Sequence, residues 1–165
     1  MKRILTADLL RETLHYDAET GVLTWLVSRG KATVGDVAGA VNSRGYLVVG
    51  LYGSLYVAHR LAWMWVYGKW PDSEIDHINC NRSDNRLVNL REATVSQNRA
   101  NSSLRKKSVS GFKGVDLYKP TGRWRARVAY NKLQHNLGYF ATAEEAHAAY
   151  LVAATKLHGK YARSS

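Results

Sequence analysis

The sequence contains a single cysteine, Cys80, among its 165 residues. One thiol cannot form a disulfide within the chain, and it cannot supply the ligands of a multi-cysteine zinc ribbon. The sequence therefore predicts a protein of a reducing compartment, in which Cys80 is a bystander within a loop.

Long hydrophobic runs are also missing from the sequence. The longest one, LAWMWVYG at residues 61–68, is far too short to span a bilayer. Near the N-terminus, Asp8 and Glu12 interrupt the apolar segment that a signal peptide requires. These features predict a soluble protein without a membrane partner.

Acidic residues are scarce, since 13 Asp and Glu stand against 24 Lys and Arg and give a formal net charge of +11. The imbalance is local, because residues 105–165 hold twelve of the basic residues and only three of the acidic ones. A basic region of this density favours a polyanionic partner, with nucleic acid ahead of an acidic membrane. A merely soluble cationic protein is the alternative, because net charge alone says nothing about fold or specificity.

Aromatic residues, by contrast, are plentiful, with five Trp and ten Tyr. Their side chains fill small cores, and they also stack on bases and pack against a sugar-phosphate backbone. Core packing is the simplest expectation for Trp25, Trp63, Trp65 and Trp70. Contact of Trp65 and Tyr67 with DNA is the alternative.

The first part of the chain alternates short strands and helices. Thr6 is suited to cap a helix over residues 7–15, and apolar segments separated by glycines over residues 35–59 predict short strands with tight turns. The period of residues 56–68 is helical, and we expect this helix to end before Trp70-Pro71, because a residue that precedes proline avoids the α-region.

The last third of the chain predicts a small domain behind a linker. Residues 102–110 are small, polar and basic without periodicity, which is typical of a linker. Strand-like segments follow over residues 114–140, and the capping box of Thr142 and Glu145 begins a helix that Gly159 ends. The predicted architecture is a three-stranded antiparallel sheet packed on one helix.

Between these regions lies a polar stretch, EIDHINCNRSDNRLVNL at residues 74–90, with two Asp, one His and four Asn. We expect a strand that ends at Asp76 and His77, then a loop, and then a second strand over residues 87–93. A helix should begin after it, because Thr94–Gln97 fits the capping-box pattern. The order is therefore strand, loop, strand and helix.

This stretch has the side chains that phosphodiester hydrolysis requires. A base must deprotonate water, a cation must neutralise charge on the phosphate and the leaving oxygen, and the geometry must be fixed. The neutral imidazole of His77 suits the first task near pH 7, and a hard Mg²⁺ with few protein oxygens suits the second. Asp76 offers an anionic oxygen, and Asn98 in the first turn of the helix offers a neutral one.

The runs AHRLAWMWVYG, IDHINCNRSDNRLVNLREAT and SQN, within residues 56–101, resemble an HNH endonuclease of the phage and intron-encoded homing type. The resemblance implies a ββα-metal motif in which His77 is the general base. It implies that Asp76 and Asn98 bind one divalent ion, Mg²⁺ first and Mn²⁺ second. It also implies that Asn89 bonds across the loop and so fixes His77. The third motif position holds Asn98 rather than a histidine, as in some phage members.

A second resemblance covers the last domain. KGV at 113–115, GRWRARV at 122–128 and LGYFATAEEAHAAY at 137–150 resemble an AP2 DNA-binding domain, a type found beside HNH modules in phage endonucleases. The family lays its three-stranded sheet in the major groove of DNA. Plant members carry an Arg soon after GV, where this chain has Asp116 or Leu117, so the target sequence does not transfer.

Basic residues of both regions are candidates for DNA contact. Side chains alternate along a strand, so Arg123, Arg125 and Arg127 share one face that suits phosphate and guanine, while Trp124 takes the other. The predicted DNA-binding set is Arg82, Arg86, Arg91, Arg99, Arg105, Lys106, Lys107, Lys113, Arg123, Trp124, Arg125 and Arg127. A solvated loop accounts for one or two of the arginines near Asp76 and His77, and a plain flexible tether is the alternative for the run at 105–107.

The sequence thus predicts an α+β fold with an N-terminal HNH module over residues 1–101, whose ββα-metal motif spans about 74–101. A linker over 102–110 and an AP2-like domain over 111–165 follow. The predicted function is a site-specific DNA endonuclease of the bacterial host cytoplasm that acts as a monomer or weak dimer, nicks one strand and needs no protein partner. A non-catalytic DNA-binding regulator is the alternative, and an RNA-binding module is a weaker third possibility because the chain has no RNP-like or GXXG pattern.

Overall fold

The structure is a computed structural model that describes residues 4–104 and 108–163. It divides into two compact units, Met1–Glu92 and Ala93–Ser165, called here the first and the second unit. The predicted DNA-binding residues Arg105, Lys106 and Lys107 lie outside the described residues.

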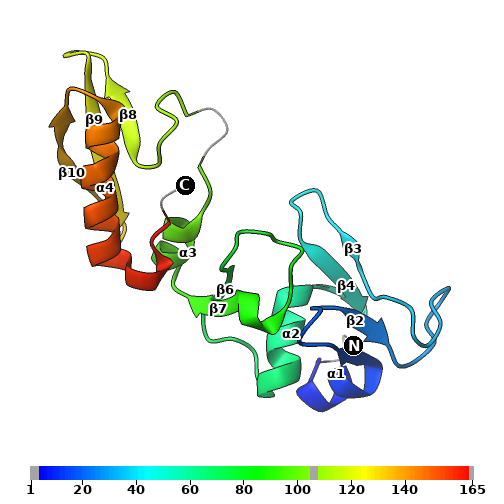
Figure 1. Cartoon of the computed structure of the whole chain (residues 1–165). Coiled ribbons are helices and arrows are strands. Elements are labelled where there is room, and N and C mark those ends of the chain that lie inside the picture. Colours follow the sequence, from blue (N-terminus) through cyan, green and yellow to red (C-terminus); the bar gives the residue numbers. More distant parts are fainter. Residues whose placement is uncertain (1–3, 105–107, 164–165) are drawn as a thin grey trace. The chain divides into compact units, whose positions relative to one another are not determined.

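Short helices and small sheets make up the first unit (Figure 1). In chain order they are α1 (Ala7–Thr13), β1 (Leu14–Tyr16), β2 (Leu23–Trp25), β3 (Ala40–Val41), β4 (Leu47–Leu51), β5 (Ser54–Val57), α2 (Ala58–Tyr67), β6 (Glu74–His77), the 3-10 helix η1 (Leu87–Asn89) and β7 (Leu90–Ala93). Antiparallel pairing joins β1 to β2 and β3 to β4 to β5, and β6 pairs with β7.

One hydrophobic core holds the first unit together. Leu10 of α1 and Leu61 and Met64 of α2 are buried in it. Ile75 of β6 and Leu90 of β7 belong to the same cluster, so the strands that flank the polar loop are anchored in the core. Burial of apolar side chains is the main stabilising term, and it fixes the position of β6.

The tryptophans contribute to this core, as predicted. Trp25 is buried, and Trp63, Trp65 and Trp70 are partly buried against the cluster. The indole Nε1 of Trp65 donates a hydrogen bond to the carbonyl of Leu14 at 3.0 Å. A buried indole N–H needs such a partner, so this bond fixes α2 against β1.

Two predicted element bounds differ from the structure. The helix expected over residues 7–15 is α1, which ends at Thr13, because Leu14–Tyr16 is extended and pairs with β2. The predicted strand over 87–93 begins with a 3-10 turn, η1, and only Leu90–Ala93 is extended. In both places the local backbone conformation ends or delays the element that the apolar pattern predicted.

Helix α2 ends before Trp70-Pro71, as expected. Its last residue is Tyr67, because Gly68 adopts a left-handed conformation, φ 74°, and its amide bonds to the carbonyl of Met64.

The second unit contains the predicted sheet and helix (Figure 1). Strands β8 (Val115–Tyr118), β9 (Arg123–Tyr130) and β10 (Leu133–Phe140) form an antiparallel sheet in the order β10-β9-β8. Helix α4 (Ala143–His158) packs on it, with Ala126 and Val128 of β9 buried against the side chains of Ala146 and Tyr150. The prediction of a mixed α/β fold with a three-stranded sheet on one helix is confirmed.

The capping residues of α4 are also as predicted. The Thr142 side chain accepts from the amide of Glu145, and the Glu145 side chain accepts from the amide of Thr142, which completes a capping box. Gly159, at φ 52°, ends the helix. A short 3-10 helix, η2 (Gly159–Tyr161), follows.

Helix α3 (Val95–Asn101) belongs to the second unit, whereas the predicted domain boundary was residue 101. It begins with the predicted capping box of Thr94 and Gln97, and it contacts α4, β9 and η2. The ammonium of Lys113 donates to the carbonyls of Ala100 and Ser102 at its C-terminal end. Lys113 thus ties α3 to the start of the sheet domain.

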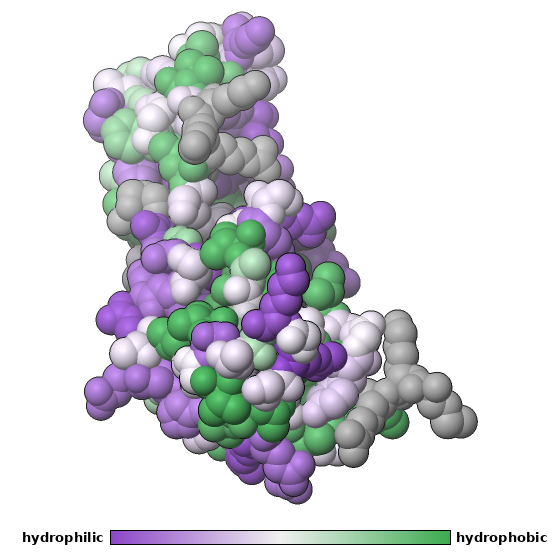
Figure 2. All heavy atoms as spheres, turned by 90° about the vertical axis from the view of Figure 1, so that its right-hand side faces the viewer, coloured by the Kyte–Doolittle hydropathy of each residue, from purple (hydrophilic) through white to green (hydrophobic). Residues whose placement is uncertain are grey.

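The surface of the first unit carries scattered apolar side chains. Val34, Val37 and Val41 are exposed. In Figure 2, hydrophobic side chains on the visible face form small patches separated by hydrophilic ones. Within the described ranges, no helix has the length and hydrophobicity that a bilayer crossing requires.

Gly114→Ala should destabilise the second unit, and Gly111→Ala is its matched control. Both glycines have a left-handed φ, +73° and +71°, but an added Cβ at Gly114 would collide with the ring of Tyr150, whereas Gly111 has open space. We expect a loss of about 2–4 kcal/mol in the free energy of unfolding at Gly114 and about 1 kcal/mol at Gly111. Chemical denaturation measures both. Equal losses would contradict the close packing of Gly114 on Tyr150.

Candidate active site

The last two residues of β6, Asp76 and His77, are buried, with 4% and 5% of their surface exposed. Charged and polar side chains are seldom buried without partners, because the loss of water costs free energy. Their burial follows from the neighbouring Ile75, which is anchored in the core of the first unit. The strand therefore holds both groups in place at the start of the polar loop.

The amide of Asn89 crosses the loop that follows. Its Oδ1 accepts from the backbone N–H of Asn79 at 2.9 Å, and its Nδ2 donates to the carbonyl of Asp84 at 2.8 Å. The backbone adds a bond from Ile78 N–H to the carbonyl of Asn89 at 2.9 Å. This is the cross-loop bonding expected of Asn89, and it ties both ends of the loop to η1.

The polar side chains within the loop bond mostly to the loop itself. Asn79 donates to Asp84 at 2.7 Å, and the side chain of Asn81 accepts from both the amide and the hydroxyl of Ser83. Short polar residues satisfy irregular backbone in this way. The hydrogen bonds of the four asparagines therefore explain why the stretch is rich in this residue: they replace the backbone bonds that a helix or strand would provide.

Asn85 is the loop residue that contacts His77, and no pattern in the sequence distinguished it from the other asparagines of the loop. It is 2% exposed, and its Oδ1 lies 3.3 Å from Nε2 of His77. An amide oxygen only accepts, so this bond puts the ring proton on Nε2 and leaves Nδ1 as the basic nitrogen of the neutral ring. The carbonyl of Asn85 is itself held by the hydroxyl of Tyr16 at 2.7 Å.

Two further rings surround His77. His59 of α2 lies edge-on with ring centroids 5.0 Å apart, and Tyr46 lies 6.0 Å away. His59 is itself buried, at 8% exposure. Burial, with the nearby charges of His77 and Arg60, lowers the pKa of His59 to about 3. His59 is thus a neutral ring near pH 7.

Burial also lowers the pKa of His77 below its usual value, although the Asn85 bond and the charge of Asp76 oppose the shift. A depressed pKa keeps the imidazole neutral near pH 7. A neutral imidazole accepts a proton, which is what a general base must do.

Asp76 forms an ion pair with Arg91 of β7. Nε and Nη2 of Arg91 reach Oδ2 of Asp76 at 2.9 and 2.8 Å, and both side chains are largely buried. Arg91 was predicted to clamp phosphate, and the structure instead places it on the carboxylate of Asp76. A buried carboxylate requires such a partner, because the desolvation of an unpaired charge is costly.

The donors present suit a hard divalent ion. Asp76 supplies a carboxylate, which Arg91 contacts at Oδ2, and within the described ranges no group of three or more His, Cys, Asp or Glu could hold a metal ion. Mg²⁺ takes one or two carboxylates and keeps several waters. Asn98, the other predicted ligand, lies on α3 in the second unit, directly after Gln97 of the capping box.

Two of the remaining predicted arginines, Arg86 and Arg82, have partners within the first unit. Arg86 pairs with Asp84 at 2.6 Å, and its guanidinium holds the pKa of that carboxyl well below its usual range. Arg82 donates to the carbonyl of Arg44 at 2.9 Å and lies over the ring of Tyr46. Arg99 is an exposed residue of α3. Of the four predicted arginines near Asp76 and His77, Arg82, Arg86 and Arg91 thus have partners within the first unit.

In the second unit, β9 carries its arginines on the face opposite α4. Ala126 and Val128 are buried against α4, so Arg123, Arg125 and Arg127 take the other face, as the period of two predicted. Trp124 lies on the core side, partly buried against the cluster. It therefore does not join the arginine row, although it was included among the predicted DNA contacts.

Asp116 of β8 stands beside this arginine row. It pairs with Arg125 at 2.7 Å and with Arg127 at 2.9 Å. Burial alone would raise the pKa of Asp116, but the bonds and charges of the two arginines outweigh it and hold the pKa low. The sequence showed Asp116 only as a departure from a family pattern, and the pairing across two strands could not be inferred from it.

Comparison with known proteins agrees with this geometry. The sequence profile of the HNH endonuclease family matches residues 56–100. An uncharacterized HNH endonuclease of Acanthamoeba polyphaga mimivirus is 31% identical over 123 residues, which are 74% of this chain and 63% of that protein. Protein 3.8 of Escherichia phage T7 is 32% identical over 108 residues, which are 64% of this chain and 87% of that protein. No solved structure matches the chain.

A buried Asp-His pair at a strand end, before a loop that an asparagine amide crosses, defines an HNH-type domain. The chain belongs to the family that includes protein 3.8 of phage T7, and its residues 56–100 are an HNH endonuclease domain. The chain spans less than two thirds of the mimivirus protein. The domain lies mid-chain, not at the N-terminus as predicted, and the residues before it share its core.

Asn89→Ala should open the polar loop, because it removes a donor and an acceptor that hold it closed. We expect a loss of about 2–4 kcal/mol in the free energy of unfolding and faster hydrogen exchange at the amide of Asn79. Val88→Ala is the control, since this neighbour is 80% exposed. If exchange at Asn79 is the same in both variants, Asn89 does not hold the loop.

Proposed function

We propose that this protein is a metal-dependent, site-specific DNA endonuclease of the homing type. The observation that carries the proposal is the buried His77 at the end of β6, held by Asn85 and by the cross-loop bonds of Asn89 within an HNH domain. Hydrolysis of a phosphodiester by water needs a fixed base, and this arrangement fixes one.

His77 acts as the general base in this proposal. With its proton on Nε2, the ring takes a proton from water at Nδ1, and Asn85 keeps the ring in the orientation that this transfer requires. Asn89 contributes indirectly, because it fixes the loop that presents Asn85. Its role is one of positioning.

Asp76 and Asn98 are the proposed ligands of one divalent ion, most simply Mg²⁺ and alternatively Mn²⁺. The ion supplies charge neutralisation on the phosphate and the leaving oxygen. Arg91 orients the carboxylate of Asp76 through Nε and Nη2, which both reach Oδ2. Residues 56–100 therefore contain a base and a carboxylate with separate tasks.

The second unit supplies most of the DNA affinity in this proposal, as an AP2-like domain. The row of Arg123, Arg125 and Arg127 is the proposed reading face, since arginine bonds to both phosphate and guanine. Asp116 orients two of these guanidinium groups. A preoriented side chain loses less conformational entropy when it binds.

One active site per chain suggests that a monomer nicks a single strand, and that a double-strand break needs a weak dimer or two successive nicks. A protein of an Escherichia phage is among the relatives, which favours action in the cytoplasm of a bacterial host.

A non-catalytic DNA-binding regulator is the second candidate. The ion pair between Arg91 and Asp76 favours it, because a carboxylate neutralised by arginine is satisfied without a metal. Asp76→Ala separates the two functions. Retained DNA binding with lost cleavage identifies a nuclease, whereas unchanged cleavage removes Asp76 from the metal site.

His77→Ala should abolish cleavage and leave DNA affinity almost unchanged. The assay follows supercoiled plasmids that carry a phage-derived insert library, with Mg²⁺ or with EDTA, and scores nicked and linear product. Loss of one general base reduces a rate by about 10²–10⁴-fold. The exposed His15 on β1 gives the control, His15→Ala. Cleavage that persists in His77→Ala, or that resists EDTA, would overturn the proposed mechanism.

Arg125→Ala should weaken DNA binding and flatten its salt dependence. Loss of one arginine contact with DNA costs about 1–3 kcal/mol, and a lost phosphate contact lowers the slope of log K against log salt by roughly 1. Lys31→Ala removes the same charge from an exposed position of the first unit and should have little effect. Normal binding by Arg125→Ala across the salt range would refute the proposed reading face.

A further inference from the structure

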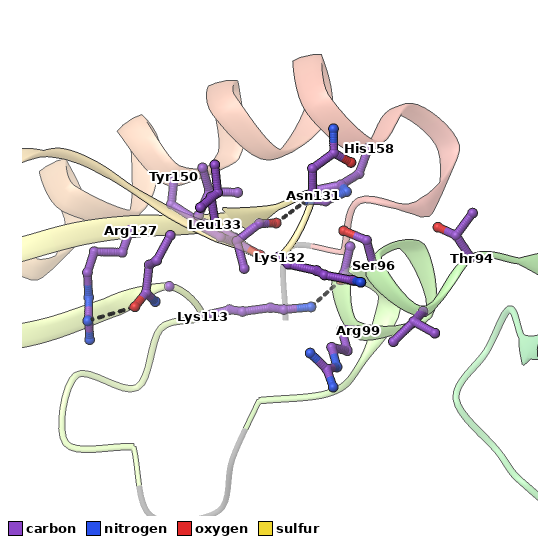
Figure 3. A pocket seen from close by; sticks show the side chains of 16 residues that line it. Thr94, Ser96, Arg99, Lys113, Arg127, Asn131, Lys132, Leu133, Tyr150 and His158 are labelled. Atoms are coloured by element: carbon purple, nitrogen blue, oxygen red, sulfur yellow. Dashed lines mark hydrogen bonds between the residues drawn. The ribbon is translucent and has the colours of Figure 1, made fainter.

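The second unit contains a pocket of about 940 Å³ between α3, the β9–β10 turn and α4. Its apolar lining includes Val128, Leu133 and Tyr150. In Figure 3, Thr94 and Ser96 lie on the side of α3. The pocket is lined by residues of the second unit alone. It is therefore a feature of one compact body.

The lining of this pocket is cationic. Its sixteen residues include Arg99, Lys113, Arg127 and Lys132, and none of them is an Asp or a Glu. In Figure 3, Arg99, Lys113 and Lys132 extend toward the same side of the pocket, beside α3. Cations that gather without a carboxylate among them repel one another, so an anion between them is stabilised.

Two of the four cations are already used by the fold. Lys113 donates to the carbonyls of Ala100 and Ser102, and Arg127 pairs with Asp116. Arg99 and Lys132 differ, because neither has a carboxylate partner among residues 4–104 and 108–163. They are the groups that can turn toward a ligand.

The backbone at Lys132 gives an independent indication. Asn131 and Lys132 form the two-residue turn between β9 and β10, with φ values of 48° and 66°. Such a turn accepts Asn readily but favours glycine at the second position. A lysine in the left-handed region costs about 1–2 kcal/mol, and such backbone strain points to a function of the side chain.

We propose that this pocket binds a phosphodiester group of the DNA backbone, held by Arg99 and Lys132 with the sugar against Leu133 and Tyr150. The inference rests on DNA as the partner of the proposed function and extends it to a contact away from the arginine row of β9. Phosphate contacts fix the register of a protein on DNA. Arg99 follows Asn98 on α3, so a phosphate held here fixes the helix that carries the proposed metal ligand.

The first test measures DNA affinity in the His77→Ala background, which separates binding from cleavage. Anisotropy of a labelled random-sequence duplex is followed over a range of KCl for Lys132→Gln, Arg99→Gln and the control Lys156→Gln. Lys156 is an exposed residue in the last turn of α4 and does not line the pocket. We expect each pocket variant to lower affinity by about three- to tenfold and the slope by up to about 1, with little change in the control. Equal effects of Lys132→Gln and Lys156→Gln would overturn the proposal.

Lys132→Gly separates function from structure. Glycine relieves the left-handed backbone, so thermal stability should rise or stay constant while DNA affinity falls as in Lys132→Gln. If Lys132→Gly binds DNA as the parent does, the side chain has no role in binding and the proposal fails. Failure of cleavage by the wild-type protein would refute the nuclease but leave these binding results intact.

NMR on the full chain tests whether the pocket binds a phosphodiester of DNA or any free phosphate. The amides of Asn131 and Lys132 are followed during addition of a duplex, and separately of inorganic phosphate at matched ionic strength. Shifts with duplex at concentrations where inorganic phosphate gives none support a DNA phosphodiester. Shifts with inorganic phosphate alone, or with duplex only on β9, would overturn it.

Discussion

The cross-loop bonds of Asn89 are the constraint on which the candidate site depends. One side-chain amide satisfies a donor at one end of the polar loop and an acceptor at the other. The loop has no regular secondary structure, so without these bonds its backbone groups would have to find water or other partners. Because the loop is closed in this way, Asn85 lies against His77, and the ring has one orientation and one tautomer.

The core explains why such a loop is stable where it lies. Ile75 and Leu90 stand on the two strands that leave the loop, and both are buried in the cluster that includes α1 and α2. Hydrophobic burial thus fixes the ends, and hydrogen bonds fix the path between them. The segment before residue 56 is for this reason part of the structural support of the HNH domain, although the family profile does not cover it.

Paired charge is the common feature of both units. Asp76 lies on Arg91, and Asp116 holds Arg125 and Arg127. In a chain of net charge +11 these few carboxylates determine which cations are oriented and which remain available. The pocket of the second unit differs from these ion pairs, since its lining has cations and no carboxylate. A count of basic residues does not show which of them are held by a carboxylate and which can bind a ligand.

The sequence by itself determined what depends on near neighbours along the chain. Patterns a few residues long predicted both capping boxes and the strands of the sheet domain. They also predicted the sheet face on which Arg125 lies and the strand that ends at Asp76 and His77. The predicted bounds of α1 and β7 were wrong where strand pairing and a 3-10 turn overrode the apolar pattern. Only the tertiary structure decided that His59 and Asn85 surround His77, that Arg91 lies on Asp76 and that Lys132 lines a pocket with Arg99. These contacts join separate elements, and the packing that brings the elements together is not encoded in any local period.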